Sequence, residues 1–259
     1  HIAPGHGDDD YNLGIQNGVD IVQTVQDDGK YNHHAKGFEN EHIYKVDDKI
    51  AEKLKEFSKL LFKGTLRHSY PHSWRSKAPL IYRNTPQWFI SMEKNKLRDI
   101  ALKSIDETVF YPPQGQTRLR SMIETRPDWC VSRQRVWGVP LPLFVSKETG
   151  QPLRDLEVVE RIADIYEEEG SDTWFTEDPQ RFLGEKYNLD DYDQVKDVVE
   201  VWFDSGSTHA FCLEKREDLK WPASMYLEGS DQHRGWFHSS LLESSGTRGR
   251  APYESVLTH

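Results

Sequence analysis

Two carboxylates, Glu228 and Asp231, follow a short apolar run at residues 224–227, where they could bind a polar ligand. The pattern predicts a strand over 224–227, a turn at Glu228 and Gly229, and then a helix capped by Ser230 or Asp231. Ligands of α/β sheets bind outside the carboxyl ends of the strands. Both carboxylates are therefore expected to accept hydrogen bonds from sugar hydroxyls or from an ammonium group. The alternative is that they only cap the helix.

Two tryptophans flank this region. Trp202 is expected at the end of a β-rich run that begins at Val198, before a Ser/Gly/Thr loop, and Trp236 follows the acidic turn. Indole rings are large and rigid, so the pair could form two walls of an apolar side-chain pocket. Ordinary core packing of both rings is the alternative.

The opening segment HIAPGHGDDDY places His1, His6 and three aspartates, Asp8 to Asp10, around two glycines. Such a cluster could bind a metal or orient a water molecule, although surface loops also collect these residues. His68 and His72 have the spacing of zinc ligands on a helix, but Pro71 would break that helix. We expect no metal bound by this segment.

Five arginines crowd into residues 117–135, with a local excess of three positive charges, whereas the whole chain of 259 residues has a formal charge of −10. Together with Trp129 and Trp137 they suit contact with a phosphate backbone. An Arg-rich solvated face paired to an acidic insert is the alternative. The five are Arg118, Arg120, Arg126, Arg133 and Arg135.

The elements that must position these residues are predicted to alternate between helices and strands. Apolar spacing predicts helices at 47–63, 97–105 and 156–169. Short β-rich runs predict strands at the following ranges: 19–25, 78–83, 86–92, 198–203 and 224–227. This alternation favours an α/β fold.

The composition places the chain among folded proteins outside the membrane. Eight Trp, 11 Tyr and 11 Phe are too many for a disordered segment. No apolar run is long enough to span a bilayer, and the first residues lack an export signal. Because the chain has only two cysteines, Cys130 and Cys212, we expect no disulfide and a reducing cytoplasm.

Six segments, in chain order, resemble bacterial-type isoleucyl-tRNA synthetases, a family of class I aminoacyl-tRNA synthetases. They are HIAPGHGDDDY, HSYPHSWR, TPQWFISM, RPDWCVSRQRVWGVP, VWFDSGSTH and YLEGSDQHRGWF. The family's HIGH and KMSKS signatures are absent, so the resemblance implies an internal fragment of such an enzyme. A valyl-tRNA synthetase fragment is the alternative within the group.

The resemblance implies a split nucleotide-binding, Rossmann-like core interrupted by insertions. Residues 1–83 would be the C-terminal part of the editing domain, and 84–145 the return to the catalytic core. Residues 146–197 would be a second, smaller insertion, in agreement with their acidic composition. Residues 198–259 would be the second half of the nucleotide fold.

The resemblance also implies ligation of isoleucine to its tRNA, with ATP and Mg²⁺ as cosubstrate. The full enzyme would be a monomer, and this piece alone would be inactive. Binding of the isoleucyl-adenylate would fall to Glu228, Gly229, Asp231, Gln232 and His259. Trp202 and Trp236 would line the isoleucine side-chain pocket, and the five arginines would contact the tRNA.

An editing site is implied as well. A hydrophobic pocket rejects a side chain shorter by one methylene by only about 1–3 kcal/mol, a limit for which isoleucyl-tRNA synthetase itself is the standard worked example. Asp10 would bind the ammonium group of mischarged valine, and His1 would contact the terminal adenosine or orient the attacking water. The competing hypotheses are a tRNA-binding module without catalysis and a free-standing deacylase.

Overall fold

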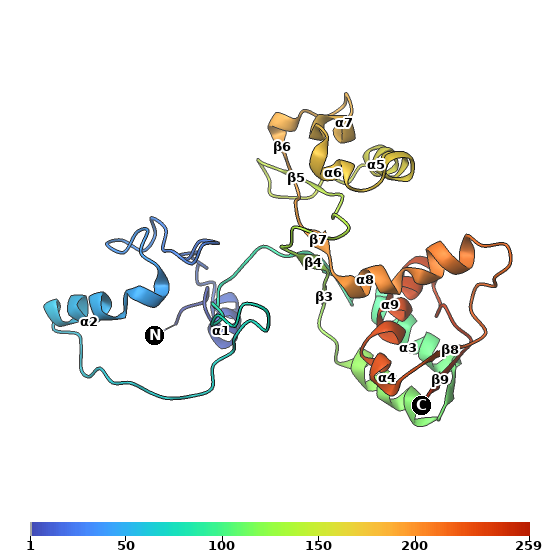
Figure 1. Ribbon diagram of the computed structural model, residues 1–259, viewed down its shortest axis with the longest axis horizontal. Coiled ribbons are helices and arrows are strands. Elements are labelled where there is room, and N and C mark those ends of the chain that lie inside the picture. Colours follow the sequence, from blue (N-terminus) through green and yellow to red (C-terminus); the bar gives the residue numbers. More distant parts are fainter. Residues whose placement is uncertain (1) are drawn as a thin grey trace. The chain divides into compact units, whose positions relative to one another are not determined.

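The computed structural model describes residues 2–259 and divides into two compact units, His1–Pro86 and Gln87–His259 (Figure 1). Among the described residues, no helix combines the length and the apolar character needed to cross a bilayer.

The first unit has little regular structure. Its helices are α1 (Asp8–Gln16), η1 (Ile43–Lys45) and α2 (Asp47–Glu56). Long loops connect them, held by isolated bridges such as Val25 with Tyr31. Val25, Val46 and Ala51 are buried apolar side chains of this unit.

Three predictions for the first unit were wrong. The helix expected to reach residue 63 ends at Glu56, and Leu61 is fully exposed, because this end of the apolar stripe has no surface to cover it. The runs 19–25 and 78–83 form no strands and make only single bridges. A β-rich run needs a neighbouring strand to pair with, which single-sequence propensity does not supply.

The second unit is built on a parallel sheet. Three strands, in the order β2-β9-β8, make up this sheet: β2 (Val109–Tyr111), β9 (Ser255–Thr258) and β8 (Tyr226–Glu228). Phe110, Val256 and Tyr226 are aligned across it and are buried. Because successive side chains of a strand alternate between faces, these three mark the face on which the core is built.

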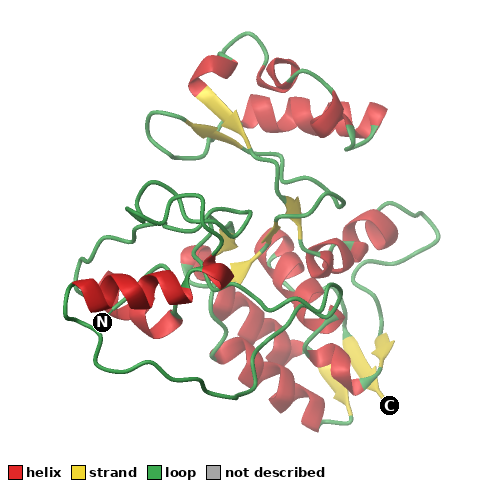
Figure 2. Ribbon diagram, turned by 60° about the vertical axis from the view of Figure 1, so that its left-hand side comes forward, coloured by secondary structure: helices red, strands yellow, loops and turns green. Residues whose placement is uncertain are grey.

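Helices pack beside this sheet, as Figure 2 shows. They are α3 (Leu97–Glu107), α4 (Gln114–Glu124), α8 (Val201–Gly206) and α9 (Trp236–Arg248), with the 3₁₀ turn η2 (Lys94–Lys96) before α3. α9 is buried on most sides, and its small serines allow close packing against α8. The predicted α/β class and the predicted helix at 97–105 are confirmed.

A smaller lobe is connected to this core by two antiparallel chain segments. Short strands pair along them: β4 (Ser132–Arg133) with β7 (Val198–Val199), and β5 (Phe144–Ser146) with β6 (Tyr192–Gln194). The lobe also contains α5 (Leu156–Glu169), α6 (Thr173–Thr176), α7 (Pro179–Leu183) and η3 (Leu189–Asp191). Trp174, Phe182 and Leu183 are buried in its own apolar core.

The predicted helix at 156–169 is confirmed in the lobe as α5. Asp155 caps it by accepting the N–H of Glu157 at 2.9 Å, and Gly170 ends it. The lobe, residues 144–194, largely coincides with the range 146–197 that was expected to be an insertion. Its role as a named synthetase insertion stays a prediction.

Two strand predictions in the second unit were too long. Residues 86–92 form only β1 (Phe89–Ile90), which pairs with β3 (Trp129–Cys130). The run 198–203 is a strand only over β7, and α8 begins at Val201. The turn lies at Glu200, whose N–H donates to Val131 O and whose buried carboxylate accepts the Trp129 indole N–H. This long-range contact is invisible to local propensity.

Candidate functional site

The carboxyl ends of β8 and β9 lie side by side at the candidate site. Glu228, the last residue of β8, is paired in register with Thr258, and His259 follows directly. A Cβ placed on Gly229 would lie 4.0 Å from His259 Cε1. Glu228 and His259 are both exposed. The structure therefore brings together three of the predicted adenylate-binding residues where ligands of parallel sheets bind.

The predicted cap of the following helix was wrong. A 3₁₀ turn, η5 (Ser230–His233), follows Gly229, and α9 begins only at Trp236. Neither Ser230 nor Asp231 caps a helix through its side chain. Asp231 Oδ2 instead accepts a hydrogen bond from Gln232 Nε2 at 2.9 Å. The exposed carboxylates of Glu228 and Asp231 thus have no capping role that would explain them.

Trp236 is held in place at three points. Its ring stacks on Tyr226 with centroids 3.9 Å apart and planes at 6°. Its Nε1–H donates to Ser205 O at 3.0 Å, and its backbone N–H donates to Gln232 Oε1, also at 3.0 Å. The indole is only partly buried. Gln232 therefore fixes the first residue of α9, whatever else it binds.

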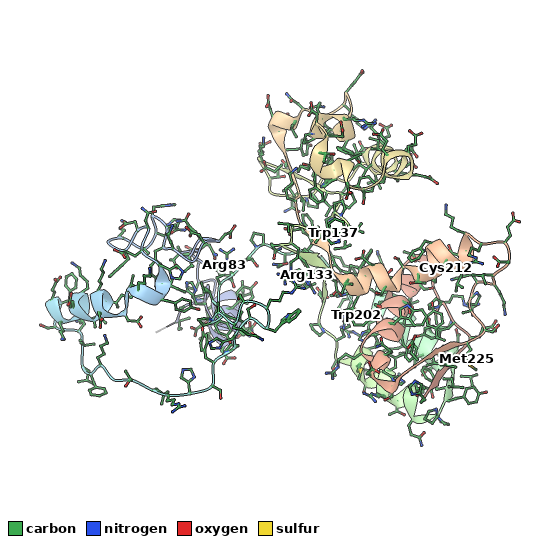
Figure 3. The ribbon with its side chains drawn as sticks, viewed as in Figure 1. Arg83, Arg133, Trp137, Trp202, Cys212 and Met225 are labelled. Carbon is green, nitrogen blue, oxygen red and sulfur yellow. The ribbon has the colours of Figure 1, made fainter. Side chains whose placement is uncertain are left out.

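Trp202 lies on α8 rather than at a strand end, as labelled in Figure 3. It is 40% exposed, so it is not sealed in the core. A Cβ on Gly235 would come within 2.8 Å of Trp202 Cη2 and 3.0 Å of Cζ3. Trp202 thus lies against Gly235, the residue directly before Trp236, and the predicted adenylate-binding residue Gln232 lies against the same glycine.

Sequence reasoning missed three residues that build this arrangement. Tyr226 supports Trp236 by stacking on its ring, Ser205 accepts its indole N–H, and Gly235 makes room for Trp202. A glycine immediately before a tryptophan in a polar turn was the available signal for Gly235. Tyr226 and Ser205 had none, because their contacts span 10 and 31 residues.

Ionisable groups that are buried or half-buried lie on α8 and α9, the helices that carry Trp202 and Trp236. Burial, and then the nearby Asp204 and Glu200, raise the pKa of Glu243 to about 9. Burial and Glu200 also raise the pKa of Asp204. Burial, with the charges of Arg126 and Arg234, lowers the pKa of His238 to about 3. At neutral pH Glu243 is therefore protonated and His238 is neutral.

The five arginines expected to contact tRNA do not form one uniform strip. Arg120, on α4, makes ion pairs with Asp106 at 2.7 Å and with Glu124 at 3.0 Å. Arg133 makes an ion pair with Glu200 at 3.3 Å. These carboxylates lie outside the acidic segment 146–197. Arg120 and Arg133 are therefore paired, but not with the acidic insert that the alternative interpretation named.

The other three arginines differ in exposure. Arg126 lies over the Trp129 ring, 5.5 Å from its centroid, and burial lowers its pKa. Arg118 and Arg135 are exposed. The role of the five arginines in tRNA contact stays a prediction.

In the first unit, Asp10 lies in the first turn of α1 and its Oδ2 accepts the N–H of Ala3 at 2.9 Å. His6 contacts Thr24 Oγ1 and Tyr82 O through its two ring nitrogens, each at 2.9 Å. The predicted partner His1 lies outside the described residues. The role of Asp10 therefore stays a prediction.

A separate open cavity of about 850 Å³ lies in the lobe, lined by polar side chains that include Lys147, Lys186 and Tyr187. None of the predicted site residues lines it. Across residues 2–259, no three His, Cys, Asp or Glu side chains are grouped so that they could hold a metal ion.

A family model described as tRNA synthetases class I (I, L, M and V) matches residues 16–259. The chain belongs to the class I tRNA synthetases. The predicted family is thereby confirmed, together with an α/β region suited to its nucleotide-binding fold.

Three individual relatives of this chain are named isoleucine-tRNA ligase. An isoleucine-tRNA ligase of Pelagibacter ubique is 66% identical over all of the chain. Isoleucine-tRNA ligases of Gluconobacter oxydans and Brucella abortus are 51% and 54% identical, again over the whole chain. The chain spans only 28–29% of the length of these relatives.

Proposed function

We propose that this chain is part of an isoleucine-tRNA ligase and contributes the site that binds the aminoacyl-adenylate. The proposal rests mainly on one observation: the ends of β8 and β9 bring Glu228, Gly229 and His259 next to the cluster of Gln232, Trp202 and Trp236. The names of the relatives give the amino acid.

In the proposed reaction, the isoleucine carboxylate attacks the α-phosphate of ATP to form isoleucyl-adenylate and release pyrophosphate. A ribose hydroxyl at the tRNA 3′ end then takes the acyl group, and AMP leaves. The exposed Glu228 and Asp231 carboxylates accept hydrogen bonds from ribose hydroxyls of the adenylate. Gly229 allows the nucleotide to approach the backbone closely. No protein nucleophile is needed, since positioning and charge stabilisation supply the rate.

The amino-acid side chain would lie against the faces of Trp202 and Trp236, which offer rigid apolar area. ATP would bring Mg²⁺ with it. We assign no Mg²⁺ ligand to this chain. Arg118 and Arg135, both exposed, are the first candidates for tRNA phosphate contacts.

The test uses a full-length enzyme in which this chain replaces the matching segment of the Pelagibacter ubique relative. Glu228→Ala should lower isoleucine-dependent exchange of pyrophosphate into ATP at least tenfold, which corresponds to about 1.4 kcal/mol of transition-state binding. Glu254→Ala is the matched control, because this exposed glutamate lies at the opposite end of β9, where it makes an ion pair with Lys220. Equal activity of the two variants would refute the role of Glu228.

A second proposed function is hydrolysis of mischarged valyl-tRNA in the first unit. The position of Asp10 in the opening motif favours it, with Oδ2 engaged by Ala3 and the carboxylate only partly buried. A carboxylate there could bind a free α-ammonium by a charge-assisted hydrogen bond. Asp10→Asn can still accept from Ala3 but loses the charge.

In the same full-length enzyme, Asp10→Asn should therefore let valyl-tRNA accumulate while isoleucylation continues. Asp8→Asn, an exposed neighbour in the same helical turn, is the control. Unchanged deacylation of valyl-tRNA in Asp10→Asn would exclude this role.

A further inference from the structure

Gly235 contacts Trp202 and directly precedes Trp236, the two tryptophans of the proposed isoleucine site. We propose that Gly235 is a positioning residue that sets the spacing between Trp202 and Trp236 and so determines how well the site distinguishes aliphatic side chains of different length. The proposal rests on the proposed function and names a specificity determinant of that same site.

The first observation behind the proposal is the close contact between Gly235 and Trp202. A Cβ at Gly235 would lie 2.8 Å from Trp202 Cη2, whereas ordinary contacts of a Cβ are 3.4–4 Å. The ring edge would have to move by at least 0.6 Å to restore such a contact. Trp202 is 40% exposed, so its ring can move toward solvent without opening the apolar core.

Trp236, in contrast, cannot follow that movement. Tyr226 stacks on its face, Ser205 O accepts its indole N–H, and Gln232 Oε1 accepts its backbone N–H. Ser205 also belongs to α8, so the backbone of the helix that carries Trp202 is tied to Trp236. With Trp236 and the α8 backbone fixed, the side chain of Trp202 is the adjustable wall.

The same substitution would disturb Gln232. Its Oε1 is the other atom that a Cβ on Gly235 would meet, and it is the acceptor for Trp236 N–H. A hydrophobic site distinguishes side chains that differ by one methylene only weakly. A wall displaced by more than half an ångström should therefore change affinity for isoleucine and its ratio to valine.

The experiment measures amino-acid-dependent pyrophosphate exchange in the full-length enzyme described above. Gly235→Ala should raise the KM for isoleucine at least tenfold and lower the isoleucine-to-valine ratio of kcat/KM at least threefold. Gly246→Ala, on the same helix, is the control, because its Cβ would meet Leu97 Cδ1 at an ordinary 3.5 Å. It should match the parent enzyme in both values.

A rescue variant separates the contact from a general loss of structure. Trp202→Phe removes the ring atoms nearest to Gly235 but leaves the contact with Gln232 in place. The effect of Gly235→Ala on the isoleucine KM should therefore be at least threefold smaller in the Trp202→Phe background, without vanishing. This comparison remains measurable if Gly235→Ala alone does not fold. An equal effect of Gly235→Ala in both backgrounds, or an unchanged KM for isoleucine, would overturn the proposal.

Failure of the proposed function would look different. A parent enzyme without isoleucine-dependent exchange would remove the function itself. An active parent enzyme that is sensitive to Glu228→Ala but indifferent to Gly235→Ala would remove only the spacing role.

Discussion

The lobe at residues 144–194 and the α8–α9 region of the core differ in how many of their buried polar atoms have a hydrogen-bond partner. In the lobe, Trp174 Nε1–H donates to Val195 O, and Arg161 donates to the carbonyls of Phe182 and Leu183. Near α9, polar atoms without a hydrogen-bond partner among the described residues are numerous. They include atoms of His233, His238, Glu243, Ser244 and Ser245. In the described part of the lobe, the hydroxyl of Tyr166 is the buried side-chain atom without a partner.

Unpaired buried polar atoms are costly and therefore uncommon in regions built only for stability. Departures from the rules of stable packing are expected at functional sites. The lobe therefore pairs most of its buried polar groups within the chain, whereas α9, which carries Trp236, leaves several such atoms without a partner among the described residues. Three predictions test this contrast.

The largest effect is expected in the apolar core of the lobe. Trp174 is fully buried and contacts the rings of Phe144, Tyr166 and Phe182. Trp174→Ala should lower the free energy of unfolding of the lobe by about 3–5 kcal/mol, measured by urea denaturation. Phe175→Ala, an exposed neighbour in α6, should change it by less than about 1 kcal/mol. Similar losses in both variants would show that the lobe lacks a specific core.

A middle-sized effect of the opposite sign is expected at Glu243. The folded state raises the pKa of this carboxyl to about 9, so the folded protein holds a proton that the unfolded chain releases above pH 4.5. Stability therefore falls as the pH rises from about 4.5 to 9. Glu243→Gln keeps the shape without the titration and should stabilise the core by at least about 1 kcal/mol at pH 7.5.

Thermal unfolding of Glu243→Gln at pH 5 and pH 7.5 tests this expectation. The gain should shrink at pH 5, where holding the proton costs the folded state little free energy. A gain of the same size at both values would mean that Glu243 is already ionised in the folded protein.

The smallest effect is expected at Asp155, the cap of α5. Hydrogen bonds from Lys186 and then Tyr187 lower the pKa of Asp155 to about 2. Its stabilisation is therefore complete above pH 3.8 and is lost as the pH falls toward 2. Asp155→Asn should flatten the acid dependence of lobe unfolding in this window, as followed by circular dichroism. An unchanged acid dependence would assign it to other carboxylates.

Local sequence patterns predicted the fold class because burial of regular apolar stripes decides it. The stripes of α3 and α5 each face a core, and both helices lie where the spacing indicated. The same spacing failed beyond Glu56, where the structure has no core for Leu61 to join. Whether a stripe is buried depends on distant segments.

For the candidate site, residue types were predictable but their support was not. The sequence motif indicated Glu228, Asp231, Trp202 and Trp236, and the structure places them around one corner of the sheet. The late start of α9 was not foreseen, because it depends on Gln232 accepting the N–H of Trp236. The functions assigned to these residues stay predictions.

The paired segments that connect the lobe to the core have a consequence for how this protein could change over evolutionary time. Ser132 stands opposite Val199, and Phe144 opposite Gln194, so the chain departs and returns through adjacent positions. In topological terms the lobe is a long insertion in the loop of a β-hairpin. Insertions, deletions or wholesale exchange beyond that point leave the alignment of β2, β9 and β8 untouched, and new recognition surfaces can be acquired there without rebuilding the parallel sheet.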